Sequence, residues 1–253
     1  MNRAQKEQAR HMDIEGFTQT KGLGFKLAED ITLYLKDKGR IQTSKVAYWE
    51  DTKLCAIKTH SFLGSTPDFR LLAGTKGKEC LLYAKGNKAR TSFEWKVTPG
   101  AETKGLRCAT IKAKRASFYE PLAYNVQVEL LEEDFKDSIT HVDGVSWTTQ
   151  TLSLRRKGKR VATLTLKKCS SFTGRRTYEL LAKQGEHLGL VLLVCAVLDW
   201  LRGVSAAASS GTSGSSRASS YSGTSHGDYS FACLYSSSFS SCGDGGGGGD
   251  CGC

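Results

Sequence analysis

Near its carboxyl-terminal end the chain contains the segment LGLVLLVCAVLDWLRG (residues 188–203), which opens with eleven apolar residues. A helix built from these residues is apolar on every side, and such a helix must be surrounded by protein or by lipid. Eleven to about fifteen residues rise roughly 22 Å at most, whereas a bilayer core of ~30 Å needs about 20 residues. We therefore expect a helix over residues 186–201 that is buried in protein, with a membrane span and an interfacial or re-entrant segment as the alternatives. Asp199 and Arg202 are expected to mark the point where this helix leaves the core.

The long segment before the helix alternates with a period of two, which is typical of β-strands with one buried face. The clearest case is the run in which Phe93 and Trp95 alternate with Glu94 and Lys96. Weaker runs of the same kind follow one another between polar or glycine-containing breaks. The pattern predicts twelve strands, at residues 31–35, 45–49, 54–59, 69–73, 80–84, 93–97, 106–112, 124–130, 140–142, 151–154, 162–166 and 177–181.

Regularly spaced strands with no helical pattern between them favour a β-sandwich or a closed barrel over a parallel α/β sheet. A barrel of about twelve strands encloses more space than its own inward side chains fill. The apolar helix has a suitable size and polarity to occupy that space. The sequence therefore predicts a mainly β fold: a closed antiparallel barrel of about 12 strands that encloses a C-terminal hydrophobic helix.

Three regions of the chain differ in composition. Residues 1–24 form a polar N-terminal extension, residues 25–203 form the barrel with its helix, and residues 204–253 are rich in Ser, Gly and Cys. The last region has too few apolar residues to bury, and we expect it to be a disordered tail. No apolar leader with a cleavage site is recognised at the start of the sequence, so an intracellular location is expected, in the cytoplasm or on the cytoplasmic face of a membrane.

The chain has nine cysteines. Cys55, Cys80, Cys108, Cys169 and Cys195 lie in apolar segments and are expected to pack as small hydrophobes, without a disulfide framework. The other four lie in the tail, where thioester acylation, prenylation of the terminal Cys-Gly-Cys, metal capture and the absence of any specific chemistry are the alternatives. These tail residues are Cys233, Cys242, Cys251 and Cys253.

The net charge of the chain is +11. The tail contains one arginine against three aspartates, a net charge of −2, which leaves +13 on residues 1–203. A cationic body raises the local concentration of anionic partners without choosing among phospholipids, acidic membranes and nucleic acids. Nucleic acid is disfavoured as a partner, because aromatic residues such as Phe93 and Trp95 fall on the face of the strand that we expect to be buried.

Basic residues crowd one predicted turn and the segments that follow it. If neighbouring strands pair, we expect these charges to converge at one end of the barrel and to attract an anionic headgroup, at about 1 kcal/mol per cation near a membrane surface. The alternative is a solvated hairpin that blunts a sheet edge. The residues are Arg155, Arg156, Lys157, Lys159, Arg160, Lys167, Lys168, Arg175 and Arg176. A second, weaker candidate combines Lys112, Lys114 and Arg115 with Phe118 and Tyr119.

Signals for catalysis are weak. The string GTSHG (residues 223–227) matches the nucleophile-elbow pattern but lies in the tail, where no strained strand-to-helix turn is expected. Residues 22–24 lack the third glycine of a dinucleotide-binding loop, and His60 and His141 have no partner that the sequence identifies. The sequence thus predicts no catalytic residue, no metal site, no cofactor and no small-molecule substrate.

Three features resemble a known family: the strand, basic turn and strand over residues 147–168, the strand GRRTYEL (residues 174–180), and the closing apolar helix with Asp199. Together they resemble the tubby C-terminal-like fold shared by tubby proteins, phospholipid scramblases and LURP-one-related proteins, and most of all small fungal tubby-like proteins. The resemblance spans residues 25–202. It implies a helix-filled barrel that binds phosphoinositides through basic residues, and it carries no particular site residue over to this chain.

These observations lead to the expectation of a non-enzymatic module that binds anionic phospholipid, as a phosphoinositide headgroup, or that acts as an adaptor close to a membrane. A scramblase-like lipid transporter is one alternative, in which the apolar helix enters the bilayer. An enzyme of unrecognised class is the second alternative, and a structural or stress-response protein that binds another protein is the third. The sequence does not indicate an oligomeric state.

Overall fold

The computed structural model describes residue 27 and residues 29–38, 44–60, 65–73, 79–89, 92–100, 107–117, 122–131, 139–170 and 175–210. Within these residues the chain forms twelve strands and one helix. They are β1 (Ile31–Asp37), β2 (Ser44–Trp49), β3 (Thr52–His60), β4 (Asp68–Ala73), β5 (Cys80–Lys88), β6 (Ser92–Pro99), β7 (Ala109–Arg115), β8 (Tyr124–Leu130), β9 (Ile139–Val145), β10 (Thr151–Arg156), β11 (Lys159–Cys169), β12 (Arg176–Ala182) and α3 (Leu188–Ser210).

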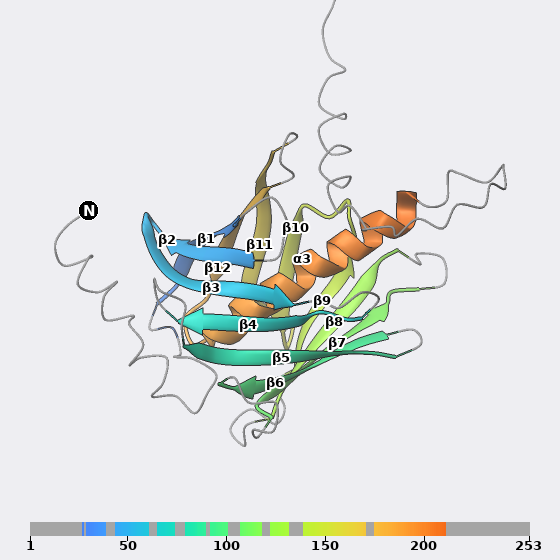
Figure 1. Ribbon diagram of the computed structural model, residues 1–253, viewed down its shortest axis with the longest axis horizontal. Helices are drawn as coiled ribbons and strands as arrows, with labels where there is room; N and C mark the ends of the chain where they lie inside the picture. Colours follow the sequence, from blue (N-terminus) through green and yellow to red (C-terminus); the bar gives the residue numbers. More distant parts are fainter. Residues whose placement is uncertain are drawn as a thin grey trace, which may run out of the picture.

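The strands form a closed antiparallel barrel in which each strand pairs with the next along the chain (Figure 1). β1 closes the ring because it pairs with both β2 and β12. The predicted barrel is confirmed, and every predicted strand is present, most of them with shifts at their ends. One strand is displaced as a whole: β7, expected at residues 106–112, begins at Ala109 and continues to Arg115 because Ala113 extends the inward row of Ala109 and Ile111.

The core of the barrel comes from alternate residues of the strands. In β8, for example, Tyr124, Val126, Val128 and Leu130 are buried while the residues between them are exposed or half-buried. Inward residues from all twelve strands form one cluster with the side chains of α3. Since no separate second core is needed to account for the buried strands, the barrel and its helix fold around the same hydrophobic interior.

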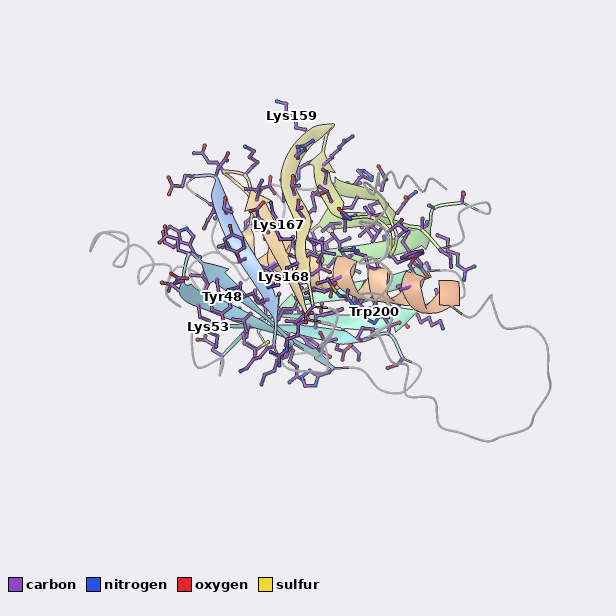
Figure 2. All side chains as sticks on the ribbon, turned by 90° about the horizontal axis from the view of Figure 1, so that it is seen from above. Tyr48, Lys53, Lys159, Lys167, Lys168 and Trp200 are labelled. Atoms are coloured by element: carbon purple, nitrogen blue, oxygen red, sulfur yellow. The ribbon has the colours of Figure 1, made fainter. Side chains whose placement is uncertain are left out.

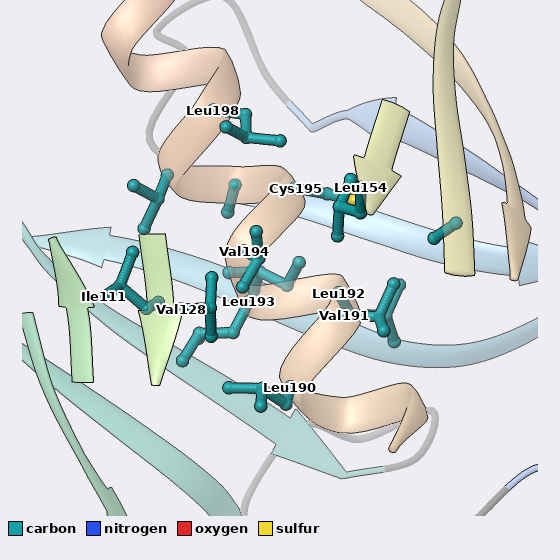
Figure 3. Packing of buried hydrophobic residues seen from close by; sticks show 14 of the residues in the cluster. Ile111, Val128, Leu154, Leu190, Val191, Leu192, Leu193, Val194, Cys195 and Leu198 are labelled. Carbon is teal, nitrogen blue, oxygen red and sulfur yellow. The ribbon is translucent and has the colours of Figure 1, made fainter. Parts of the chain in front are cut away.

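The helix α3 runs through the barrel (Figure 1) and is roughly 34 Å long at 1.5 Å per residue. Figure 3 shows Leu190, Leu192 and Val194 projecting from different sides of α3, with strand residues such as Ile111 and Val128 around it. The segment Leu188–Ala206 is long and apolar enough to cross a membrane, but 89% of it is buried inside the protein. The expectation of a core helix is therefore confirmed, although our estimate of its apolar length was too short.

The helix also continues past its predicted end. We expected it to end at Leu201 and the tail to begin at Val204, whereas α3 extends to Ser210. The reason is a buried anchor at Ser205, whose hydroxyl donates a hydrogen bond to the carbonyl oxygen of Leu122 and accepts one from the backbone N–H of Trp147. These contacts are between segments far apart in the sequence, so composition alone did not reveal them. The rest of the predicted tail, and the predicted N-terminal extension, lie outside the described residues.

Aromatic residues of β6 pack against the helix. The ring centroids of Phe93 and Trp200 are 5.1 Å apart, and those of Trp95 and Trp200 are 5.6 Å apart, both in edge-to-face geometry. The Trp95 indole N–H donates a hydrogen bond to the carbonyl oxygen of Pro67 (2.9 Å). These rings therefore serve the core and are not available as a stacking platform for nucleic-acid bases.

Candidate functional site

The basic residues that we expected to converge are divided between the two ends of β11. Lys159 is the first residue of β11, and Lys168 pairs with Thr177 near its last residue. At about 3.3 Å per residue these two lysines lie roughly 30 Å apart along the strand. Figure 2 shows Lys159 at the far tip of the β10–β11 hairpin, well separated from Lys167 and Lys168. The strands pair as predicted, but the hairpins at the two ends of β11 face opposite directions, so the expected single cluster is wrong.

One group of cations lies at the β10–β11 turn. Lys157 (φ 48°) and Gly158 (φ 77°) both have positive φ, the geometry of a tight type I′ turn. Arg155 pairs directly with Arg160 across the hairpin and, on its other side, with His141 of β9. We call the four exposed cations of this turn the hairpin tip: Arg155, Lys157, Lys159 and Arg160.

The hairpin tip contains uncompensated positive charge. Two arginines directly opposite each other on neighbouring strands repel one another. Among the described residues, no carboxylate lies within ion-pair distance of any of the four cations. The tip therefore presents four exposed positive charges to a partner outside the chain.

Arg156 differs from its neighbours because its side chain turns inward. Its guanidinium forms a two-pronged ion pair with Glu186, with Nη1–Oε1 and Nη2–Oε2 distances of 2.9 Å each, and its Nε donates to the Thr140 hydroxyl. Burial raises the pKa of Glu186, although the charge of Arg156 opposes that shift. The pair connects β10 to the start of α3, so Arg156 has a structural role and is removed from the predicted lipid-binding set.

A small cavity lies behind this ion pair. Its lining includes Thr140, Arg156, Glu186 and His187, and its volume is about 20 Å³. That is room for a single water molecule. This cavity is too small to admit an organic substrate.

At the opposite end of β11 the predicted residues have different surroundings. Lys167 pairs with Glu179 of β12 (2.8 Å), and this hydrogen bond raises the pKa of Lys167. Lys168 and Arg175 are exposed, whereas Arg176 is only 4% exposed. Only part of this group can therefore meet an external anion.

Arg176 belongs to a buried polar group that the sequence did not lead us to expect. We call this group the Asp199 cluster; its members are Asp37, Lys45, Arg176, Tyr178, Asp199 and Arg202. Asp199 of α3 is its centre: Oδ2 lies 2.6 Å from Lys45 Nζ, and Oδ1 lies 2.6 Å from Arg176 Nη1. The Tyr178 hydroxyl donates a further hydrogen bond to Oδ1. Asp199 thus ties the helix to β2 and β12.

Asp37, on β1, connects the members of the cluster that lie on the strands. Its Oδ1 lies 2.5 Å from Lys45 Nζ, and its Oδ2 accepts a hydrogen bond from the backbone N–H of Arg176 (2.9 Å). Arg202, one turn beyond Asp199 in α3, donates through Nη1 to the Tyr178 hydroxyl (3.3 Å). Asp199 and Arg202 are each only 6% exposed, so the expectation that they mark where the helix leaves the core is wrong.

Oppositely charged members of the Asp199 cluster stabilise each other's ionised forms. Burial by itself would raise the pKa of Asp199, but the charges of Arg176 and Lys45 overcome it and hold that pKa well below its usual range. Burial would likewise lower the pKa of Lys45, and the carboxylates of Asp199 and Asp37 raise it instead. Burial and the charge of Asp199 raise the pKa of Tyr178 to about 12. These shifts favour the charged forms of Lys45, Arg176 and Asp199 at neutral pH.

The sequence contains a signal for this cluster, which we interpreted instead as a sign that the helix leaves the core. Asp199 and Arg202 are spaced three residues apart in an apolar helix, which places them on the same side. Lys45 and Asp37 occupy inward positions of β2 and β1, where an apolar residue fits the alternation. Charged residues at inward positions of two strands, together with a charged pair in the enclosed helix, predict a buried ion network.

The remaining predicted candidates do not form a site in the described part of the chain. Lys112 pairs with Glu129 (3.3 Å), while Lys114 and Arg115 are exposed. Phe118 and Tyr119 lie outside the described residues, as do the four tail cysteines. His60 and His141 are both exposed, and the described residues include no group of three potential metal ligands.

The cysteines of the barrel agree with expectation in four cases. Cys55, Cys108 and Cys195 are buried and Cys80 is half-buried, all as free thiols. Burial raises the pKa of Cys55 and of Cys195 to about 12, which makes both thiols unreactive at neutral pH. Cys169, predicted to pack in the same way, is instead half-buried at the last position of β11 and is disulfide-bonded.

Comparison of the chain with protein-family models, with curated proteins and with solved structures finds no match.

Proposed function

We propose that this protein is a non-enzymatic, tubby-like module that binds anionic phospholipid headgroups through the hairpin tip. The observation that carries the proposal is the direct pairing of Arg155 with Arg160, without a carboxylate partner among the described residues. Repulsion of this kind costs stability, and a bound anion would relieve it. Phosphoinositide-containing membranes supply such charge at high density.

The strength of binding follows from the number of cations. At about 1 kcal/mol per cation, four cations contribute about 4 kcal/mol, or roughly three decades in the partition constant. Binding is therefore expected to weaken as the salt concentration rises, because salt screens the attraction between exposed cations and anionic headgroups.

The transporter alternative receives less support. It requires α3 to enter a bilayer, which would separate Asp199 from Lys45 and Arg176. Breaking buried ion pairs of this kind costs several kcal/mol, because each charge loses its partner. Acylation of the tail cysteines would add a second membrane signal to the cationic barrel, and it belongs to this proposal as a separate element.

The test is flotation of the purified chain with vesicles of neutral phosphatidylcholine and with the same vesicles containing a phosphoinositide, over a salt series. The variant R155Q/R160Q removes two of the four cations and should weaken binding by about 2 kcal/mol, roughly 30-fold. The matched control is K85Q/K96Q, because Lys85 and Lys96 are also exposed and directly opposite each other, on β5 and β6.

Comparing the two variants distinguishes binding at the hairpin tip from general attraction of anionic vesicles to the cationic surface. If R155Q/R160Q binds less and K85Q/K96Q binds as the natural chain does, the hairpin tip is the docking surface. Equal loss in both variants would show attraction without a site. If the natural chain does not float with anionic vesicles, the lipid proposal is wrong and a protein partner becomes the hypothesis to pursue.

A further inference from the structure

The Asp199 cluster carries one more positive charge than negative. Three of its members are cations, namely Lys45, Arg176 and Arg202, and two are carboxylates, Asp37 and Asp199. All five are at least nine-tenths buried. A charge enclosed in this way is strongly destabilising unless an opposite charge and hydrogen bonds accompany it.

The unbalanced charge is that of Arg202. Both oxygens of Asp199 are engaged by Lys45, Arg176 and Tyr178, and those of Asp37 by Lys45 and the backbone of Arg176. Within the part of the chain that the structure describes, no carboxylate lies within ion-pair distance of the Arg202 guanidinium.

The hydrogen-bond donors of Arg202 are also incompletely used. Nη1 donates to the neutral Tyr178 hydroxyl at 3.3 Å, a long contact, and the guanidinium carbon lies 5.7 Å from the centre of the Tyr178 ring. Arg202 Nε is buried and has no hydrogen-bond partner among the described residues. A neutral hydroxyl and a ring face compensate the charge only in part, and they leave the Nε–H without an acceptor.

A planar guanidinium binds oxyanions better than other anions, because its parallel N–H groups match two oxygens of a phosphate, sulfate or carboxylate group. We propose that Arg202 is the binding site for a small tetrahedral oxyanion, a phosphate or sulfate group, which neutralises the Asp199 cluster. Free inorganic phosphate and the phosphomonoester of a lipid headgroup share this chemistry. Arg202 is only 6% exposed, so the bound oxyanion would be largely enclosed by the protein.

This site is separate from the hairpin tip. Arg156, next to the tip, pairs with Glu186 just before α3, whereas Arg202 is sixteen positions further along, roughly 24 Å at 1.5 Å per residue. The anion site therefore does not depend on the proposed function, and each can fail without the other.

The proposal predicts the sign of a mutational effect. In chloride buffer the variant R202M should be at least as stable as the natural chain, since it removes an enclosed charge and leaves the cluster neutral. Phosphate should stabilise only the natural chain, because a ligand that binds the folded state lowers the unfolding equilibrium constant by a factor of 1 + [L]/Kd. At phosphate concentrations of about 100 times Kd, the unfolding constant should fall about 100-fold, so that the natural chain overtakes R202M.

The experiment is urea unfolding of the full chain in chloride, phosphate and sulfate at equal ionic strength. R202M is compared with R115M, a matched loss of an exposed arginine at the end of β7. General salting-out by phosphate and sulfate stabilises the natural chain, R202M and R115M alike. Binding at Arg202 is therefore measured by how much more phosphate stabilises the natural chain and R115M than it stabilises R202M. An equal response of R202M and the natural chain, or lower stability of R202M in every buffer, would overturn the proposal.

A second measurement does not depend on R202M folding. Phosphorus NMR of inorganic phosphate should show line broadening with the natural chain and with R115M, and weaker broadening with R202K, whose ammonium keeps the charge but not the paired N–H groups. Absence of broadening with the natural chain overturns the proposal. Repeating the titration with glycerol phosphate and with inositol phosphate distinguishes the sources: tighter binding of either than of inorganic phosphate identifies a headgroup, and equal or weaker binding identifies the free ion.

Discussion

Replacement of Asp199 by asparagine tests whether the helix is held in the barrel by its ion pairs. The change keeps the shape of the side chain and removes the charge that lies 2.6 Å from both Lys45 Nζ and Arg176 Nη1. Three buried cations then face the single carboxylate of Asp37. The loss differs from that of a surface pair because water cannot solvate the charges that remain.

The size of the effect follows from that burial. Removing one partner of a buried ion pair costs about 3 to 5 kcal/mol. The two pairs share one carboxylate, so their costs do not add, and we expect D199N to lower the free energy of unfolding by about 4 kcal/mol. For a domain of this size that corresponds to a decrease in Tm of roughly 10 °C.

Urea unfolding monitored by tryptophan fluorescence measures this loss, since Trp95 and Trp200 pack against each other where α3 meets β6. The control is K112Q, which breaks the Lys112–Glu129 pair; its side chains are 43% and 38% exposed, and the expected cost is below about 1 kcal/mol. The double variant D199N/R176M should recover part of the loss, because it removes one of the uncompensated cations. A cost for D199N no larger than that of K112Q would refute the reasoning, and would mean that apolar contacts alone hold the helix.

Two further predictions concern the barrel wall. Gly86→Ala should lower the free energy of unfolding by about 1 to 3 kcal/mol, because a Cβ there would lie 2.5 Å from the carbonyl oxygen of Pro67. Urea titration measures this loss, with K85A, a change at the exposed neighbouring residue, as the control. Equal stability of the two variants would contradict the prediction. Tyr83 and Tyr178 have pKa values raised to about 12, so the folded chain holds their protons more tightly than the unfolded chain, whose tyrosines titrate near pH 10. The two tyrosines therefore stabilise the folded chain fully below about pH 10, and this stabilisation is lost as pH rises toward 12. At about pH 11 the tyrosinate absorbance of the folded chain should be lower by the amount of two tyrosines than that of the unfolded chain. Ionisation of every tyrosine near pH 10 while the chain stays folded would contradict this.

The candidate site was predictable in its composition and not in its arrangement. The crowding of Arg155 to Arg160 at a turn is a local property, and the turn is where the sequence places it. Whether Lys167, Lys168 and Arg176 join that group depends on the length and direction of β11, and the antiparallel pairing separates them. Arg156 and Arg176 differ from their exposed neighbours only through partners distant in sequence, Glu186 and Asp199.

The sequence by itself determined the class of the fold, because both of its signals are local. Alternation of apolar and polar residues specifies strands, and an apolar segment without a polar face specifies an enclosed helix, whatever lies around them. Only the tertiary structure decided which charges are enclosed: barrel closure brings Lys45 of β2 to Arg176 of β12 and Asp199 of α3, both more than a hundred positions away in the sequence. Burial makes such pairs energetically decisive, and burial is a property of the closed barrel and not of any segment of the chain.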